Sequence, residues 1–167
     1  MTEMLDIVNL DDIVIDNMAK STIYQKKGVL FRVINAFIIN PKNELWIPTR
    51  HPKKQLFPNC LDCSIGGHVK SGENYFQAFC REAIEETNIN PLNHPHKLLT
   101  TLSPLHHKTS AFMHVYAIYT DCLIDYNNED FIDFEWLSPK SLRKKLGLGV
   151  PAKSDLPIIL EECFKDA

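Results

Sequence analysis

The sequence lacks the features that would place it among membrane, secreted or nucleic-acid-binding proteins. No apolar run approaches the ~20 residues that a membrane-spanning helix needs, and the run at residues 33–39 is interrupted by Asn35. The first residues include Glu3 and Asp6 and do not show the basic and then apolar pattern of a signal peptide. The net charge of −3 gives no reason to expect a nucleic-acid surface. The five cysteines are an odd number, which argues against a disulfide framework and indicates a reducing cytoplasm.

The chain also contains no internal repeat, low-complexity segment or linker, so we expect one domain over residues 1–167. It is predicted to begin with a short β-hairpin at about 4–16, whose turn is residues 9–12. Further strands are expected at 29–39, 44–49, 60–65, 97–104, 111–121 and 131–137, and helices from 73 or 74 to 88, from 139 to 147 and, capped by Ser154, toward 165. Hairpins without a regular βαβ repeat indicate an α/β (α+β) fold with helices on the faces of a mixed sheet.

Three glutamates on the first long helix form the most informative pattern. Glu82, Glu85 and Glu86 are spaced i, i+3, i+4, which places them as neighbours about 5–6 Å apart on one helix face. Three like charges that close repel one another and need a counter-ion, and a hard divalent cation with oxygen ligands meets that need. The apolar residues of the helix, from Phe76 to Ile84, are predicted to face a sheet on the other side.

The spacing of residues 67–89 matches a known motif, and the motif residues are, in order, Gly67, Glu73, Arg81, Glu82, Glu85, Glu86, Asn88 and Ile89. This segment resembles the Nudix box, and the resemblance extends over about residues 30–146. Two positions depart from the pattern: Ala83 is smaller than the usual aliphatic residue, and Asn88 replaces a glycine. Asparagine is the second choice after glycine for a left-handed residue that ends a helix. The implied fold is the Nudix α/β/α sandwich with a mixed sheet.

The resemblance implies a hydrolase that cleaves a diphosphate, typically in a nucleoside diphosphate linked to a further group X. It implies Mg²⁺, or Mn²⁺ as an alternative, bound by Glu82, Glu85, Glu86 and the Gly66 carbonyl. In the family Glu73 and Arg81 form a supporting ion pair. The general base varies among Nudix enzymes, and here Glu82 and Glu129 both remain candidates. Arg50 is the candidate for a phosphate contact, because a guanidinium matches phosphate oxygens in shape and charge.

Other interpretations are weighed against the hydrolase. The N-terminal region resembles the subgroup related to isopentenyl-diphosphate isomerase, but that enzyme needs a cysteine where this chain has Gly66, and a metal-binding histidine near Phe31. A non-catalytic Nudix ligand-binding module usually loses a box glutamate, and this chain keeps all four. Cys60 and Cys63 have the spacing of half a zinc site, but no second pair follows. The substrate is left open, and so is a homodimer formed through the N-terminal hairpin.

Overall fold

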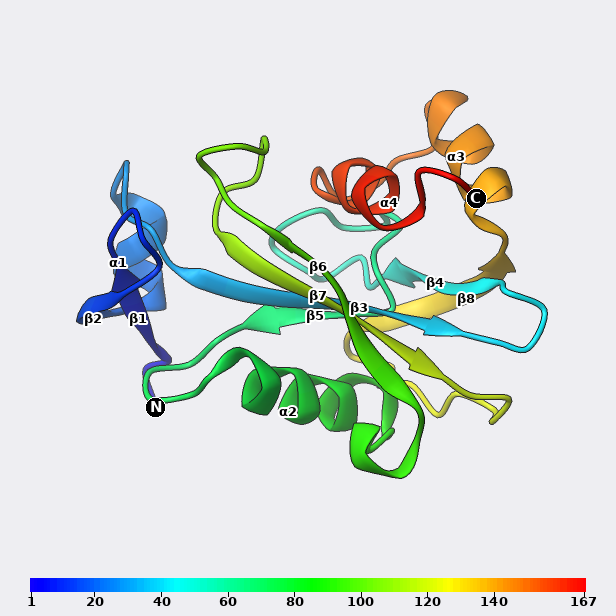
Figure 1. Ribbon diagram of the computed structural model, residues 1–167, viewed down its shortest axis with the longest axis horizontal. Coiled ribbons are helices and arrows are strands. Elements are labelled where there is room, and N and C mark those ends of the chain that lie inside the picture. Colours follow the sequence, from blue (N-terminus) through cyan, green and yellow to red (C-terminus); the bar gives the residue numbers. More distant parts are fainter.

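The computed structural model describes all of residues 1–167 and has three layers. A mixed sheet lies in the middle, α2 covers one face, and α3 and α4 cover the other (Figure 1). The strands are β1 (Met4–Val8), β2 (Val14–Ala19), β3 (Arg32–Ile39), β4 (Leu45–Arg50), β5 (Ile65–His68), β6 (His96–Leu102), β7 (Phe112–Tyr119) and β8 (Phe131–Leu137). The helices are α1 (Lys20–Gln25), α2 (Tyr75–Thr87), the 3₁₀ helix η1 (Pro91–Asn93), α3 (Pro139–Gly147) and α4 (Leu156–Phe164).

The main sheet has the strand order β6-β7-β3-β4-β8, and β5 also pairs with β3. Only β3 and β7 run parallel to each other, so the sheet is mixed, as expected. One edge of β3 is shared: residues 33–36 pair with β5, whereas β4 meets β3 only at Ile39 and Leu45. The sheet therefore divides at β3 into two branches, one formed by β5 and one formed by β4 and β8. This division lets residues of α2, β5 and the following loops approach one another.

Side-chain alternation along β3 divides the core into two clusters. Ile34, Ala36 and Ile38 pack with Phe79 under α2, while Phe37 packs with the side chains under α3 and α4 on the other face. Fully burying one such side chain contributes about 1.5–3 kcal/mol. These two apolar layers hold the sheet and α2 in a fixed relation, which positions the polar residues at the edge of β5.

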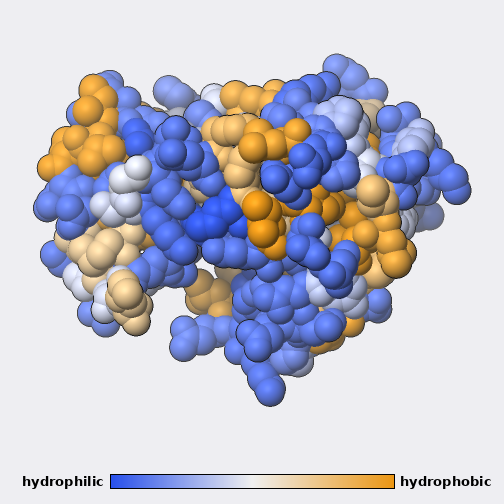
Figure 2. Space-filling view, turned by 90° about the horizontal axis from the view of Figure 1, so that it is seen from below, coloured by the Kyte–Doolittle hydropathy of each residue, from blue (hydrophilic) through white to orange (hydrophobic).

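The N-terminal residues form a separate lobe beside the sheet (Figure 1). β1 and β2 form the predicted hairpin, which extends to Ala19, beyond the expected end at 16. α1 follows directly and was not predicted, because six residues are too few to show a helical period. Seen from below, the surface is hollowed between this lobe and the rest of the molecule (Figure 2). Every helix of the structure falls short of the length and apolar character that a membrane span requires.

Three predictions about local structure are wrong. The strand expected at 60–65 lies instead at 65–68, because Leu61 forms only isolated bridges and the two glycines are inside β5. Ser154 does not cap the last helix; Asp155 is the N-cap residue, and its side chain makes no capping bond. Ile84 does not belong to the buried face of α2, since 47% of it is exposed.

Candidate active site

The ends of α2 are set by side chains that the sequence places there. Asn74 accepts a hydrogen bond from the backbone N–H of Gln77, and the Gln77 side chain accepts one from the N–H of Asn74, which is a capping box. At the other end Asn88 has φ of 54°, and its N–H donates to the carbonyl of Ile84. The left-handed helix stop predicted at Asn88 is confirmed. Ala83 is fully buried, in the row of small and aromatic residues that face the sheet.

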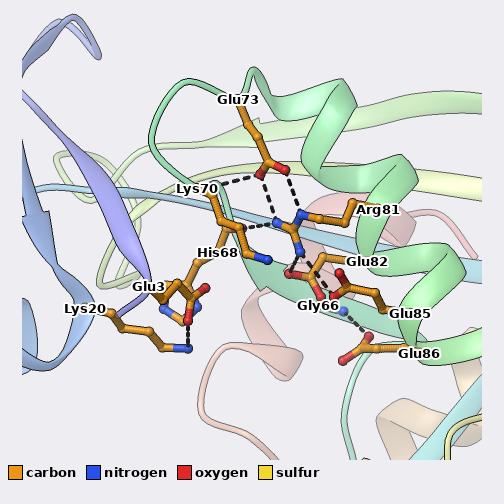
Figure 3. Close-up of polar contacts among 10 residues, drawn as sticks. All are labelled: Glu3, Lys20, Gly66, His68, Lys70, Glu73, Arg81, Glu82, Glu85 and Glu86. Carbon is orange, nitrogen blue, oxygen red and sulfur yellow. Dashed lines mark hydrogen bonds and ion pairs between the residues drawn. The ribbon is translucent and has the colours of Figure 1, made fainter. Parts of the chain in front are cut away.

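Arg81 joins the acidic residues around it into one network (Figure 3). Its guanidinium donates to both carboxylate oxygens of Glu73, at 2.7 and 2.9 Å. Nη1 donates to Glu82 at 2.6 Å and, at 3.3 Å, to Glu85. Nη2 also donates to the carbonyl of His68 in β5 at 2.9 Å. Because one planar group bonds the loop before α2, the helix itself and β5, Arg81 fixes the orientation of the carboxylates between them.

Glu82 lies directly against the backbone of β5. A Cβ atom placed on Gly67 would lie 2.1 Å from the carboxyl carbon of Glu82, so only glycine leaves room for this carboxylate. The side chain of Glu82 is 12% exposed. Its burial raises its pKa, and this effect outweighs the opposing hydrogen bond from Arg81. The pKa of Glu73 is lowered instead: burial is the largest single effect and opposes the shift, but the hydrogen bonds from Arg81 and from the backbone of Lys70, together with the positive charges of these two residues, outweigh it.

Glu86 differs from the other carboxylates because no cation pairs with it. Its Oε2 accepts a hydrogen bond of 2.9 Å from the N–H of Gly66, as Figure 3 shows, and it forms no ion pair. Loss of hydration raises its pKa well above the usual range, and the negative charges of Glu82, Asp62 and Asp130 add to the shift. A charge that is desolvated and not neutralised is unstable. Glu86 is therefore the carboxylate that would gain most from a bound cation.

Each of the two other acidic residues near Glu86 forms an ion pair with a basic side chain. Asp62 pairs with Arg50 at 2.7 Å, and Asp130 pairs with Lys54. The positive charges of Arg50 and Lys54 are thus already paired with Asp62 and Asp130. The negative charge of Glu86 is left without a cationic partner. Asn127 adds a further link, because its backbone N–H donates to the carbonyl of Glu86 at 2.8 Å.

Arg50, expected to contact phosphate, is engaged in internal bonds. Besides its bond to Asp62, it donates from Nε and Nη2 to the carbonyls of Leu56 and Phe57 at 3.0–3.3 Å. Phe57 has φ of 53°, which is unusual for an aromatic residue. Arg50 therefore stabilises the turn of the loop at 51–59. A contact between Arg50 and phosphate stays a prediction. It would have to come from the N–H groups of Arg50 that these internal bonds leave free.

Glu129, the second candidate for the general base, is exposed and lies on the loop before β8. Its backbone N–H donates to the Asn127 side chain at 2.9 Å, and its carboxylate forms no hydrogen bond or ion pair. The next residue, Asp130, is the one whose charge acts on Glu86. The structure thus brings Glu73, Arg81, Glu82, Glu85, Glu86 and Gly66 together, and leaves Glu129 at the periphery.

The donor set suits a hard divalent cation, although its oxygens are partly shared with other groups. No three His, Cys, Asp or Glu side chains meet in an arrangement ready to hold a metal ion, because oxygens of Glu82 and Glu85 are bonded to Arg81. The uncompensated charge at Glu86 and the carboxylate chemistry of the set nevertheless fit Mg²⁺ or Mn²⁺. The residues therefore match the ion in chemistry and charge.

His68 extends the site toward the N-terminal lobe. Its Nε2 lies 2.7 Å from the hydroxyl of Tyr24 in α1, and its ring stacks on Phe31 with centroids 5.7 Å apart. Burial and the nearby positive charge of Lys20 lower its pKa to about 4, so the ring is neutral at physiological pH. Phe31 occupies the position where the isomerase would carry a metal-binding histidine, and packs against His68 as an apolar ring.

Comparisons with known proteins agree with this geometry. The NUDIX domain profile matches residues 29–155. The chain belongs to the Nudix hydrolase family. It is 47% identical over 154 residues to an uncharacterized Nudix hydrolase of Nostoc sp. (strain PCC 7120), covering 92% of this chain and 91% of the relative. It is 40% identical to a Nudix hydrolase of Deinococcus radiodurans, covering 98% and 95% of the two chains.

A crystal structure from Deinococcus radiodurans superimposes on this Nudix protein with a TM-score of 0.91 at 39% identity, covering 97% and 99% of the two chains. The fold expected from the sequence, an α+β Nudix fold with a mixed sheet, is therefore confirmed, and so is the assignment as a Nudix hydrolase.

Three polar residues at the site of this Nudix hydrolase were missed by sequence reasoning. Asp62 and Asn35 are buried, and Lys153 lies beside Asp62. The sequence does carry a signal for two of them, since Asn35 interrupts the apolar run at 33–39 and Asp62 is the single charged residue in segment 60–66. Nothing in the sequence marks Lys153, because its position depends on the packing of the segment before α4.

Proposed function

We propose that this Nudix hydrolase is a Mg²⁺-dependent enzyme that cleaves a diphosphate linkage in a nucleoside diphosphate linked to X or in a related small-molecule diphosphate. The observation that carries the proposal is the pair Glu82 and Glu86. Both extend from α2 to the two glycines of β5, and Glu86 has no cationic partner. The odd number of cysteines, all of them free, supports a cytoplasmic location.

Glu82, Glu85, Glu86 and the carbonyl of Gly66 would hold the ion, with Mn²⁺ as an alternative to Mg²⁺. When bound, the ion would neutralise phosphate oxygens and lower the pKa of a coordinated water. Arg81 restricts the orientations of Glu82 and Glu85, and Glu73 in turn restricts Arg81. A ligand that is already oriented loses less entropy when it binds, so we assign Glu73 and Arg81 a supporting role.

We assign the general base to Glu82 in preference to Glu129. Glu82 lies within the site and against β5, whereas Glu129 is exposed on the loop before β8. Burial raises the pKa of Glu82, and a carboxylate with a raised pKa is a stronger proton acceptor once it is ionised. Its role is to accept the proton of the water that attacks phosphorus. For the phosphate oxygens, the free N–H groups of Arg50 remain the proposed contact.

The proposal is tested by replacing the carboxylates and measuring turnover. Glu82→Gln and Glu86→Gln should each lower the rate of phosphate or nucleotide release by about 10²-fold or more, with circular dichroism showing an intact fold. The exposed Asp121, which forms no ion pair, provides a control, and Asp121→Asn should retain the wild-type rate. Wild-type turnover in the two glutamate variants would contradict the proposal.

The substrates for this assay should span nucleotide sugars, dinucleoside polyphosphates, NADH, coenzyme A, oxidised nucleotides and isoprenoid diphosphates. The same assay separates the alternative functions. An isomerase would convert isopentenyl diphosphate without releasing phosphate, and a ligand-binding module would bind a diphosphate and turn over none with any metal ion.

A further inference from the structure

A buried hydrogen-bond acceptor lies in the centre of β3 without a donor. Asn35 is 1% exposed, and its Oδ1 has no hydrogen-bond partner. Its Nδ2 donates to the sulfur of Met113 at 3.2 Å. That bond decides the orientation of the amide, because the flipped amide would place its oxygen against a sulfur that cannot donate. A buried carbonyl without a donor is costly, so this acceptor calls for a partner from outside the chain.

The free oxygen of Asn35 is directed at Gly66. A Cβ atom on Gly66 would lie 2.7 Å from Oδ1, and 3.7 Å from the Nζ atom of Lys153. Successive residues of a strand face opposite sides of the sheet. The side-chain position of Gly67 meets Glu82, so that of Gly66 faces the side of α3 and α4. The catalytic carboxylates and the free oxygen of Asn35 are therefore separated by only the backbone of β5.

Lys153 and its acidic neighbour Asp155 also lack full hydrogen bonding. Its Nζ lies 3.7 Å from Asp62 Oδ1 and 3.8 Å from Asp155 Oδ2, and both distances exceed that of a good hydrogen bond. Asp155 Oδ1 is a second buried oxygen without a donor. The side chains of Lys153 and Asp155 are 23% and 19% exposed, so solvent reaches part of these two side chains, whereas the two free oxygens themselves are buried. One ammonium and two free acceptor oxygens thus lie together behind Gly66.

We infer that Asn35, Lys153 and Asp155 form the subsite that recognises the nucleoside attached to the diphosphate. The subsite takes a polar group that carries N–H or O–H donors for the two free oxygens, together with an acceptor for Lys153. The edge of a heterocyclic base or a sugar hydroxyl has this chemistry, and a hydrocarbon chain does not. The inference rests on the proposed function, because the cleaved diphosphate must lie on the other side of β5, at Glu82 and Glu86.

The test compares two classes of diphosphate that differ in the attached group. Binding of ADP, GDP, CDP and UDP, and of isopentenyl diphosphate, is measured by calorimetry with Ca²⁺ in place of Mg²⁺ to prevent turnover. The wild-type protein should bind at least one nucleoside diphosphate about tenfold or more tightly than isopentenyl diphosphate. Asn35→Leu, which removes the acceptor at similar volume, should abolish this preference and leave the affinity for isopentenyl diphosphate unchanged.

Two controls separate recognition from packing. Phe37→Leu alters the packing on the same face of β3 without removing the free oxygen or the Met113 sulfur that orients the amide, and should keep the preference. Asn35→Leu should melt no lower than the wild type, because it replaces an unsatisfied buried carbonyl with hydrocarbon. A variant that melts well below the wild type would show that Asn35 has a structural role instead.

Three results would overturn the inference. Equal affinity of the wild-type protein for all five diphosphates would exclude selection of donor groups while leaving the proposed hydrolase intact. A preference that Asn35→Leu retains would mean that only water occupies the subsite. Failure of the wild-type protein to bind any diphosphate with Ca²⁺, combined with unchanged turnover in Glu86→Gln, would refute the proposed function and this subsite with it.

Discussion

At the scale of single residues, the site depends on two glycines, which have no side chain, as well as on the glutamates. Gly67 leaves the space that the carboxylate of Glu82 fills, and Gly66 leaves the space between Asn35 and Lys153. Neither glycine has the positive φ for which glycine is usually chosen. They are required because other side chains approach the backbone of β5 closely from both faces of the sheet.

Gly67→Ala should therefore abolish most activity without unfolding the protein. The new methyl group would lie 2.1 Å from the carboxyl carbon of Glu82, so that side chain must move out of the site. We expect turnover to fall by about 10²-fold or more, measured with the best substrate of the panel. Gly147→Ala is the matched control, since a Cβ there meets nothing within 4 Å. Equal activity of both variants would contradict the proposed position of Glu82.

Glu86 gives a prediction for the dependence of stability on pH and metal. Its pKa in the folded protein lies well above the usual value, which is about 4.3 in an unfolded chain. Between these two values the folded protein binds the proton and the unfolded chain does not, so metal-free stability falls as pH rises through this window. Glu86→Gln carries no charge and should be more stable than the wild type at about pH 8 without metal.

This prediction is measured by thermal melting in a chelator and in Mg²⁺. Each kcal/mol that Glu86→Gln adds to the free energy of unfolding should raise the melting temperature of the metal-free variant by about 2–4 °C. Mg²⁺ should stabilise the wild type more than Glu86→Gln, and more at about pH 8 than at about pH 5. Asp121→Asn should behave as the wild type. A metal-free Glu86→Gln protein that melts no higher than the wild type at about pH 8 would show that the charge of Glu86 does not destabilise the folded protein.

At the scale of elements, the loop at 51–59 is held by one side chain from β4. Arg50 bonds the carbonyls of Leu56 and Phe57, and it also pairs with Asp62. Lys54 from the same loop pairs with Asp130 near Glu86. The loop is thus tied to the acidic centre at two points, and its position is coupled to the charges there.

Arg50→Lys should release this loop while preserving the positive charge. A lysine cannot reproduce the forked geometry of the guanidinium, so the bonds to Leu56 and Phe57 are lost. We expect faster amide hydrogen exchange over residues 51–59 and unchanged exchange in α2, measured by mass spectrometry. Lys53→Arg on the exposed surface of the same loop serves as control. Unaltered exchange in the loop would mean that Arg50 is free to bind phosphate.

At the scale of the whole molecule, the N-terminal lobe presents an open strand edge. Ile13 directly precedes β2 and Ile15 lies within it, and they are 58% and 63% exposed. Figure 2 shows apolar atoms gathered on the outer end of this lobe. An open edge with apolar side chains is a surface on which a second strand can add. The homodimer suggested by the sequence therefore stays a prediction, and the open edge of β2 is the surface through which it would form.

Ile15→Lys should dissociate such a dimer, because edge lysines oppose strand addition. Sedimentation equilibrium should show a dimer for the wild type and a monomer for the variant, with unchanged circular dichroism. Leu148→Lys replaces a residue that is 76% exposed and follows α3, so it should remain dimeric. A wild-type protein that sediments as a monomer would refute the prediction.

The sequence by itself determined the helix that carries the glutamates. The spacing of Glu82, Glu85 and Glu86 on one helix, the cap at Asn74 and the stop at Asn88 are local, because helix geometry places residues three and four apart side by side. The family and the mixed sheet also followed from the motif and from the order of strands. These features depend on neighbours in the chain, which a sequence shows directly.

Only the tertiary structure decided which polar residues meet behind and beside the glutamates. The bond from Lys54 to Asp130 spans 76 residues, and Lys153 reaches Gly66 from the segment before α4. The shift of β5 to 65–68 likewise depends on β3, which pairs with the glycines. Such contacts arise because two apolar layers pack on opposite faces of one sheet, and packing brings together residues that are distant in the chain.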